Sequence, residues 1–112
     1  MKISKEAEEG IAQLQMIEQN LSSYIMQKQT FQGQLLETEN AMKEIEKVKD
    51  KAYKIIGTIM IASKKEDLKK DLGSKKEMLE LRIKTLEKQE EKLKKSAEDI
   101  QKLVMKEIKN DQ

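Results

Sequence analysis

The sequence contains no cysteine, no histidine and no proline in its 112 residues. Without cysteine and histidine the chain has no disulfides, thiolate nucleophiles, imidazole bases or the usual zinc and haem ligands. Hydrolases built on a serine–histidine or cysteine–histidine pair are therefore excluded. The lack of proline removes the commonest helix breaker from the whole length.

Aromatic residues are also scarce, with one Phe, two Tyr and no Trp, so a compact globule would lack the rings that usually help to fill a core. Charged residues make up 39% of the chain, and 23 Lys and Arg nearly balance 21 Asp and Glu. Dense, balanced charge mixed with aliphatic residues indicates long solvated helices rather than disorder. No apolar run approaches membrane-spanning length, so we expect a soluble, intracellular protein with no membrane partner.

A heptad pattern predicts a first long helix over about residues 3–49. Steps of four and three residues from Ile3 reach apolar side chains at ten of fourteen positions, which is typical of a coiled-coil seam. Lys28 occupies one seam position, where it could set the register or rest its stem on the seam and extend its amine into water. The seam positions are Ile3, Ala7, Gly10, Leu14, Ile17, Leu21, Tyr24, Lys28, Phe31, Leu35, Thr38, Met42, Ile45 and Lys49.

A second heptad pattern predicts a helix over about residues 64–110. Ser63 to Glu66 fits a capping box, which marks the start of that helix. The strong half of the seam is Leu72, Leu79, Leu86, Leu93 and Ile100, and the weaker half is Lys76, Ile83, Glu90, Ala97 and Val104.

The segment between the two patterns is rich in β-branched residues. We expect a β-hairpin with strands over 52–56 and 59–63 and a turn at Gly57-Thr58; one continuous helix is the alternative. The hairpin reverses the chain, so the two helices can pair antiparallel. Ile55 and its neighbour Ile56 point to opposite faces, so both faces need burial. A lone two-stranded hairpin is marginal in water, and the pattern therefore predicts an obligate oligomer joined through its hairpins.

These residues resemble the β class of prefoldin subunits. The segment 53–61 is similar to the family's Tyr-Lys-x-x-Gly-x-aliphatic-x-aliphatic hairpin, and 79–93 is similar to its second-helix signature, which ends in Gln89-Glu90. Gln27–Gln29 and Glu37–Glu39 also lie where similar first-helix segments occur. The link before the hairpin, residues 48–51, is shorter than usual for the family.

The resemblance implies one prefoldin-like domain over 1–112: a mainly α fold with a long antiparallel two-helix coiled coil and one central hairpin. Four such chains would join two prefoldin α subunits, and the hairpins would build a β-barrel hub. The complex would capture unfolded polypeptides without nucleotide and deliver them to a group II chaperonin in the cytoplasm. The residues expected to join the hub are Tyr53, Ile55, Ile56, Gly57, Ile59, Met60 and Ile61.

Apolar residues also gather at the start of the first helix and the end of the second. Leu103, Val104 and Met105 are consecutive, so they cannot all face one partner helix, and we expect some of them and Ile11 to be exposed. Exposed apolar residues there would grip unfolded clients; frayed helix ends are the alternative. The tip residues predicted to bind clients are Ile3, Ala7, Ile11, Leu103, Val104, Met105 and Ile108.

Other functions fit the sequence less well. A structural scaffold that self-associates through its hairpins and holds no clients is the main alternative to a chaperone. An enzyme is disfavoured because no nucleophile–base pair is present, and no metal or cofactor is expected. Nucleic acid is not an expected partner because the basic excess of the second helix is small and no aromatic platform accompanies it. The resemblance to prefoldin instead implies that Lys102, Lys106 and Lys109 could contact an acidic chaperonin surface.

Overall fold

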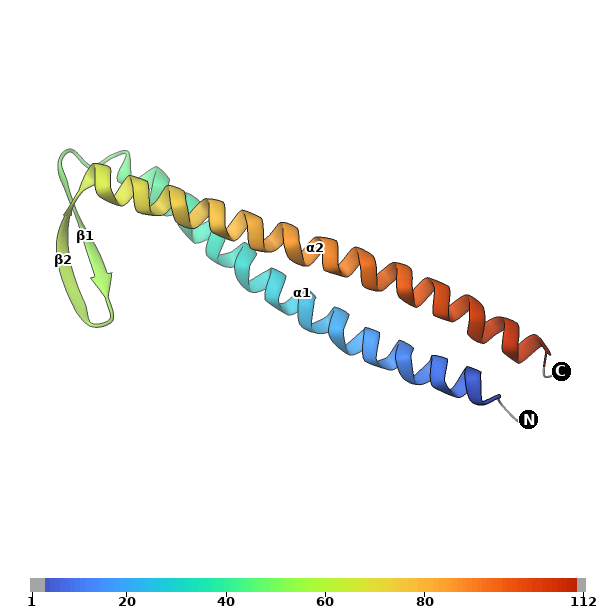
Figure 1. Ribbon diagram of the computed structural model, residues 1–112. Coiled ribbons are helices and arrows are strands. Elements are labelled where there is room, and N and C mark those ends of the chain that lie inside the picture. Colours follow the sequence, from blue (N-terminus) through green and yellow to red (C-terminus); the bar gives the residue numbers. More distant parts are fainter. Residues whose placement is uncertain (1–3, 111–112) are drawn as a thin grey trace. The chain divides into compact units, whose positions relative to one another are not determined.

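The computed structural model describes residues 4–110, with side chains as far as Ile108. Its elements follow the order α1 (Lys5–Ile45), β1 (Lys51–Ile56), β2 (Ile59–Lys64) and α2 (Lys65–Asn110), as Figure 1 shows. The predicted helix–hairpin–helix order is confirmed, and the alternative of a continuous helix through the middle of the chain is excluded.

Contacts divide the chain into two compact units. The terminal unit combines Met1–Lys28 with Thr85–Gln112, and the hairpin unit is Gln29–Lys84. In the terminal unit the first part of α1 lies antiparallel to the last part of α2. In the hairpin unit the rest of α1 precedes the hairpin along the chain, and the rest of α2 follows it. The buried apolar side chains of the terminal unit include Ala7, Leu86 and Val104; those of the hairpin unit include Ile45, Leu68, Leu79 and Ile83.

The heptad positions account for the burial within both units. The positions of the first series from Ala7 to Ile45 are buried or half-buried, and so is every position of the second series from Leu72 to Val104. Lys49, the last predicted position of the first series, lies beyond the end of α1 and is exposed, so its placement on the seam was wrong. Leu79 is the most deeply buried large side chain, at 1% exposed. Because a helix repeats every 3.6 residues, one stripe of each helix is covered, and most charged residues outside these stripes face water.

A serine cap fixes the start of α1. The backbone N–H of Ala7 donates to Ser4 Oγ at 3.1 Å, and the N–H of Glu8 donates to the carbonyl oxygen of Ser4 at 3.0 Å. Ser4 is thus the N-cap residue, which satisfies a donor that the first helical turn otherwise leaves without a partner.

The first helix ends at Ile45, four residues before the predicted Lys49. Its last turn tightens, because the N–H groups of Lys47 and Val48 donate to carbonyl oxygens only three residues back. The chain then runs to Asp50, whose carbonyl oxygen accepts a hydrogen bond from the N–H of Lys65 at 3.1 Å. This bond joins the residue before β1 to the residue after β2, so α1 has to end early enough for these two residues to meet.

Two lysines of α2 contact the residue that follows α1. Lys65 Nζ donates to the carbonyl oxygen of Glu46 at 3.2 Å, and Lys69 Nζ lies 2.7 Å from Glu46 Oε1. The hydrogen bond and the charge of Lys69 lower the pKa of the Glu46 carboxyl below its usual value. The second helix begins at Lys65, two residues after the Ser63 of the predicted capping box, because Ser63 and Lys64 still belong to β2.

Neither helix within residues 4–110 has an apolar stretch long enough to cross a membrane.

Candidate functional sites

The hairpin is a two-stranded antiparallel ladder closed by a tight turn. Its pairs run from Lys51 opposite Lys64 to Ile56 opposite Ile59, so Gly57 and Thr58 alone form the connection. Gly57 has a φ of 62° and is the one described residue with positive φ. A positive φ at the first central position followed by a negative one fits a type II′ turn, which matches the twist of paired strands and favours glycine there.

Both faces of this hairpin carry apolar side chains. Residues that lie directly opposite each other share a face, so Tyr53, Ile55, Met60 and Ala62 form one apolar face. The other face carries Ile56, Ile59 and Ile61, together with Lys54, whose amine lies 3.5 Å from the Asp71 carboxylate.

Neither face is covered by any part of the chain between residues 4 and 110. All six of the large apolar side chains predicted to join the hub are between 46% and 68% exposed. These are Tyr53, Ile55, Ile56, Ile59, Met60 and Ile61. Large, contiguous apolar surface on a two-stranded ribbon with two free edges has the character of an interface.

The tip residues, in the terminal unit, separate into buried and accessible members. Ala7 and Val104 are buried at 0% and 7% exposed, so they pack inside the unit. Leu103 and Met105, on either side of Val104, are 62% and 54% exposed. Successive helical residues differ by about 100°, so these two side chains leave α2 in different directions. Ile3 lies outside the described residues.

Ile11 and Ile108 are half-buried. Ile11 was expected to be exposed because it lies beside the seam. It lines a groove of about 360 Å³ together with the seam residues Leu14, Ile17 and Leu21, and this neighbourhood covers part of its surface. The accessible apolar surface predicted to bind clients therefore comes mainly from Leu103 and Met105.

Gly10 sets how closely the two helices of the terminal unit approach. A Cβ atom at this position would lie 2.5 Å from Val104 Cγ2 and 3.5 Å from Ile100 Cγ2. The glycine leaves the space that the valine methyl group occupies. At Gly33, by contrast, a Cβ atom would meet nothing within 4 Å apart from its chain neighbours and the backbone of its own helix.

An ion pair joins the two heptad seams. Lys28 Nζ lies 3.0 Å from Glu90 Oε1, and the two side chains are 22% and 8% exposed. Glu90 Oε1 is buried and accepts no hydrogen bond within the described residues, so the contact is ionic without hydrogen-bond geometry. Lys28 therefore does not extend its amine freely into water; it pairs with the one acidic residue of the opposite seam.

The pairing of Lys28 with Glu90 was not predicted, although both residues were placed on seams. Each seam has few polar positions, and pairing the single acidic residue of one with a lysine of the other would have suggested the contact. The Ser4 cap also went unpredicted, and its signal was a serine three residues before the first seam alanine, Ala7.

Comparisons with known proteins agree on one family. A family model described as "Prefoldin subunit" matches residues 8–111. The chain is similar to the prefoldin subunit beta of Archaeoglobus fulgidus, with 47% identity over 96 residues that cover 83% of each chain. The corresponding subunit of Pyrococcus furiosus is 40% identical over 85 residues, 74% of this chain and 73% of the relative.

A solved structure shows the same fold. The crystal structure of the prefoldin beta subunit from Thermococcus strain KS-1 has a TM-score of 0.86 to this chain at 31% identity, over 94% of both chains. The match supports two long antiparallel helices with a central hairpin as the fold.

Proposed function

The chain belongs to the prefoldin family, as a β subunit, and on that premise we propose that it is one subunit of an ATP-independent holdase complex. Prefoldin is a non-enzymatic family, so the chain is not an enzyme. The family implies a chaperone role and assembly with α subunits.

The observation that best supports this proposal is the hairpin with apolar side chains on both faces. In the proposed assembly, four copies of this chain and two α subunits pair their hairpins into a β-barrel hub. Edge-to-edge pairing would satisfy the free strand edges, and stacking of the faces would bury Tyr53, Ile55 and Met60 on one side and the three isoleucines Ile56, Ile59 and Ile61 on the other.

The proposed client surface is the accessible part of the tip residues. Leu103 and Met105 offer apolar contact, and the flexible thioether of methionine adapts to irregular partners. The buried members Ala7 and Val104 support this surface from beneath rather than touching a client. Weak contacts repeated on several subunits of one complex add up to useful retention of an unfolded chain.

We further propose that the complex acts in the cytoplasm and delivers clients to a group II chaperonin. Lys102 and Lys106, both exposed on α2, are the described members of the basic end that would meet an acidic chaperonin surface. Charge reversal at both positions is then expected to weaken chaperonin binding.

The test is reconstitution with the α subunit of the same organism. Co-expression should give a complex whose mass fits four copies of this chain and two α subunits. That complex should keep a chemically denatured enzyme soluble after dilution, as measured by light scattering without ATP.

Two variants separate assembly from client binding. Leu103→Ser with Met105→Ser should assemble normally and suppress aggregation less well. Ser22→Ala with Ser23→Ala, which changes exposed polar positions of α1, is the control and should behave as wild type. A complex that assembles and never suppresses aggregation would instead support the structural scaffold.

A further inference from the structure

A groove in the terminal unit combines an apolar floor with an acidic rim. Its floor is formed by Gly10, Ile100 and Val104, and the exposed side chain of Leu103 forms one wall. The volume is about 230 Å³, below the roughly 300–1,000 Å³ of small-molecule pockets. A groove of this size suits an individual side chain of a polypeptide better than a cofactor.

Gly10 lets the two helices pack closely beneath the groove. A side chain at this position would begin with a Cβ atom 2.5 Å from Val104 Cγ2, inside the space between the helices. Because glycine stands there, Val104 packs closely against α1 and is only 7% exposed, so the half-buried Ile100 and the exposed Leu103 supply the apolar surface that an incoming side chain can reach.

Three carboxylates surround this floor. Glu6 and Glu9 reach it from α1 and Glu107 from α2, and among the described residues none of the side chains that line the groove is positively charged. Glu6 and Glu9 are exposed, and Glu107 Oε2 accepts a hydrogen bond from Ser4 Oγ at 3.5 Å. The charges therefore stand at the edge of the apolar floor, where an incoming cation would meet them.

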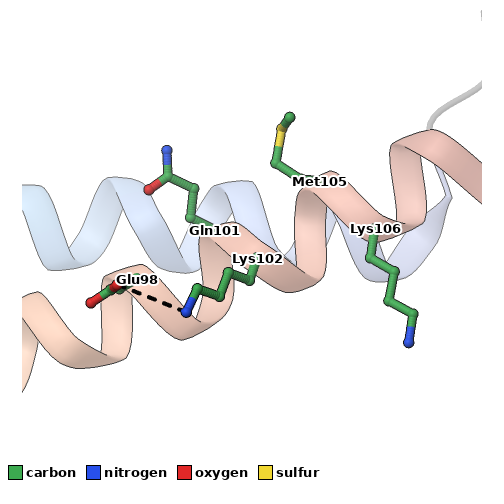
Figure 2. A pocket seen from close by; sticks show the side chains of 5 residues that line it. All are labelled: Glu98, Gln101, Lys102, Met105 and Lys106. Carbon is green, nitrogen blue, oxygen red and sulfur yellow. Dashed lines mark ion pairs between the residues drawn. The ribbon is translucent and has the colours of Figure 1, made fainter.

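Met105 lies in the opposite electrostatic setting. Figure 2 shows its side chain on α2 with Lys102 and Lys106, in a groove that Glu98 and Gln101 also line. Lys102 Nζ lies 3.8 Å from Glu98 Oε1, which leaves Lys106 as the cation without a carboxylate partner in that groove. The two accessible apolar tip residues thus differ in the sign of the charge around them.

We propose that the Leu103 groove binds client segments in which an apolar side chain is flanked by lysine or arginine. This inference rests on the proposed holdase function and adds a client class to it. The apolar side chain would enter the groove beside Leu103, and the flanking cations would pair with Glu6 and Glu9. Charge complementarity next to a dry apolar contact gives selectivity in addition to hydrophobic affinity.

The experiment uses the reconstituted complex and three short fluorescent peptides with the same leucine-rich centre. The centre is flanked by lysines, by glutamates or by serines, and binding is measured by fluorescence anisotropy at low and high salt. The lysine-flanked peptide should bind roughly three- to tenfold more tightly than the serine-flanked one, the range that a few partly exposed charge pairs provide. High salt should remove most of this difference.

Matched variants assign the preference to this groove. Glu6→Gln with Glu9→Gln should bring the affinity for the lysine-flanked peptide down to that for the serine-flanked peptide. Lys102→Gln with Lys106→Gln, which changes the Met105 groove, should leave the lysine preference intact. Glu107 is not substituted, because its contact with Ser4 joins the two helices. Circular dichroism melting should show that both pairs of variants fold.

The outcomes distinguish a failure of the charge preference, of its assignment to the groove, and of the holdase function. If the serine-flanked peptide binds and the lysine-flanked one binds no better, the charge preference is wrong and the holdase function stands. If the lysine preference survives Glu6→Gln with Glu9→Gln, the cations bind elsewhere and the assignment to the groove is wrong. If no peptide binds and the complex does not suppress aggregation, the holdase function itself is wrong.

Discussion

The helices and the hairpin differ in how far their apolar residues are buried within one chain. Apolar residues at the heptad positions of the helices are buried or half-buried within each unit, whereas some off these positions, such as Leu81 and Leu103, are exposed. The hairpin places apolar residues on both faces, and all of its large apolar side chains are exposed. A helix has one stripe to cover and one partner helix can cover it, whereas a two-stranded ribbon has two faces and two edges.

The difference indicates which parts of the protein are complete within one chain. Substitutions at the buried heptad positions of the helices should act on the stability of the fold, because the contacts that they remove are internal. Substitutions on the hairpin should act on association and leave helix content nearly unchanged. Measuring stability and association on the same variants therefore tests whether the helices and the hairpin differ in this way.

The largest effect is expected for Ile55→Ser with Met60→Ser. These residues are cross-strand partners on one face of the hairpin, and each is more than 60% exposed in the single chain. Burial of such a side chain contributes about 1.5–3 kcal/mol, so losing two should weaken assembly by roughly 100-fold or more. Size-exclusion chromatography should show loss of the complex, while circular dichroism at high concentration still shows helix.

Thr58→Ser, in the turn of the same hairpin, is the control and should assemble as wild type. Full assembly of the double serine variant would show that the hairpin faces are not the interface.

The next largest effect is expected for Leu79 of α2, and Leu81 of the same helix serves as its control. Leu79 is 1% exposed and Leu81 is 65% exposed. Leu79→Ala should lower the free energy of unfolding by about 2–5 kcal/mol, and Leu81→Ala should change it by less than about 0.5 kcal/mol. Denaturant titration of the complex followed by helix content checks both values. Equal effects at the two positions would contradict the assigned seam.

The seam ion pair should show strong non-additivity. Lys28→Met leaves the Glu90 carboxylate buried without its partner, which should lower the free energy of unfolding by about 1–3 kcal/mol. Adding Glu90→Leu should restore most of that loss, because an apolar pair often replaces a buried ion pair without cost. A double-mutant cycle by denaturant titration measures the coupling. Additive losses would mean that the two charges do not interact.

The smallest effects are expected for two glycines of α1, with opposite signs. Gly33→Ala adds a methyl group in open space and should raise the free energy of unfolding by up to about 1 kcal/mol. Gly10→Ala gains the same helix preference, but its Cβ would meet Val104 Cγ2 at 2.5 Å, so the net effect should be destabilising. Thermal melts of both variants check the signs; stabilisation by Gly10→Ala would contradict the close approach.

The main elements followed from the sequence because their periodicities differ. A heptad series from Ala7 to Ile45 and a second one from Leu72 to Val104 were enough to identify the buried stripes, and the isoleucine-rich segment around Gly57 identified the hairpin. Both patterns reflect the repeat of a single helix or strand, so they can be recognised in one sequence without knowledge of distant contacts.

The parts that the sequence did not predict depend on contacts between distant residues. The end of α1 at Ile45 reflects the bond between Asp50 and Lys65, and the accessibility of Leu103 and Met105 depends on how Val104 packs against α1. Their apolar character and their position near the helix ends placed Ala7 and Val104 among the client-binding candidates, yet both are buried. To predict that these two residues are buried, one must know which residues of the opposite helix face them, and a heptad pattern does not fix that register.

The central claim is that the hairpin is incomplete within one chain, and sedimentation of the isolated chain tests it most directly. The account predicts an average mass well above the 13.0 kDa of one chain, with a melting temperature that rises with protein concentration. A monodisperse 13.0 kDa species that melts cooperatively at every concentration would contradict it.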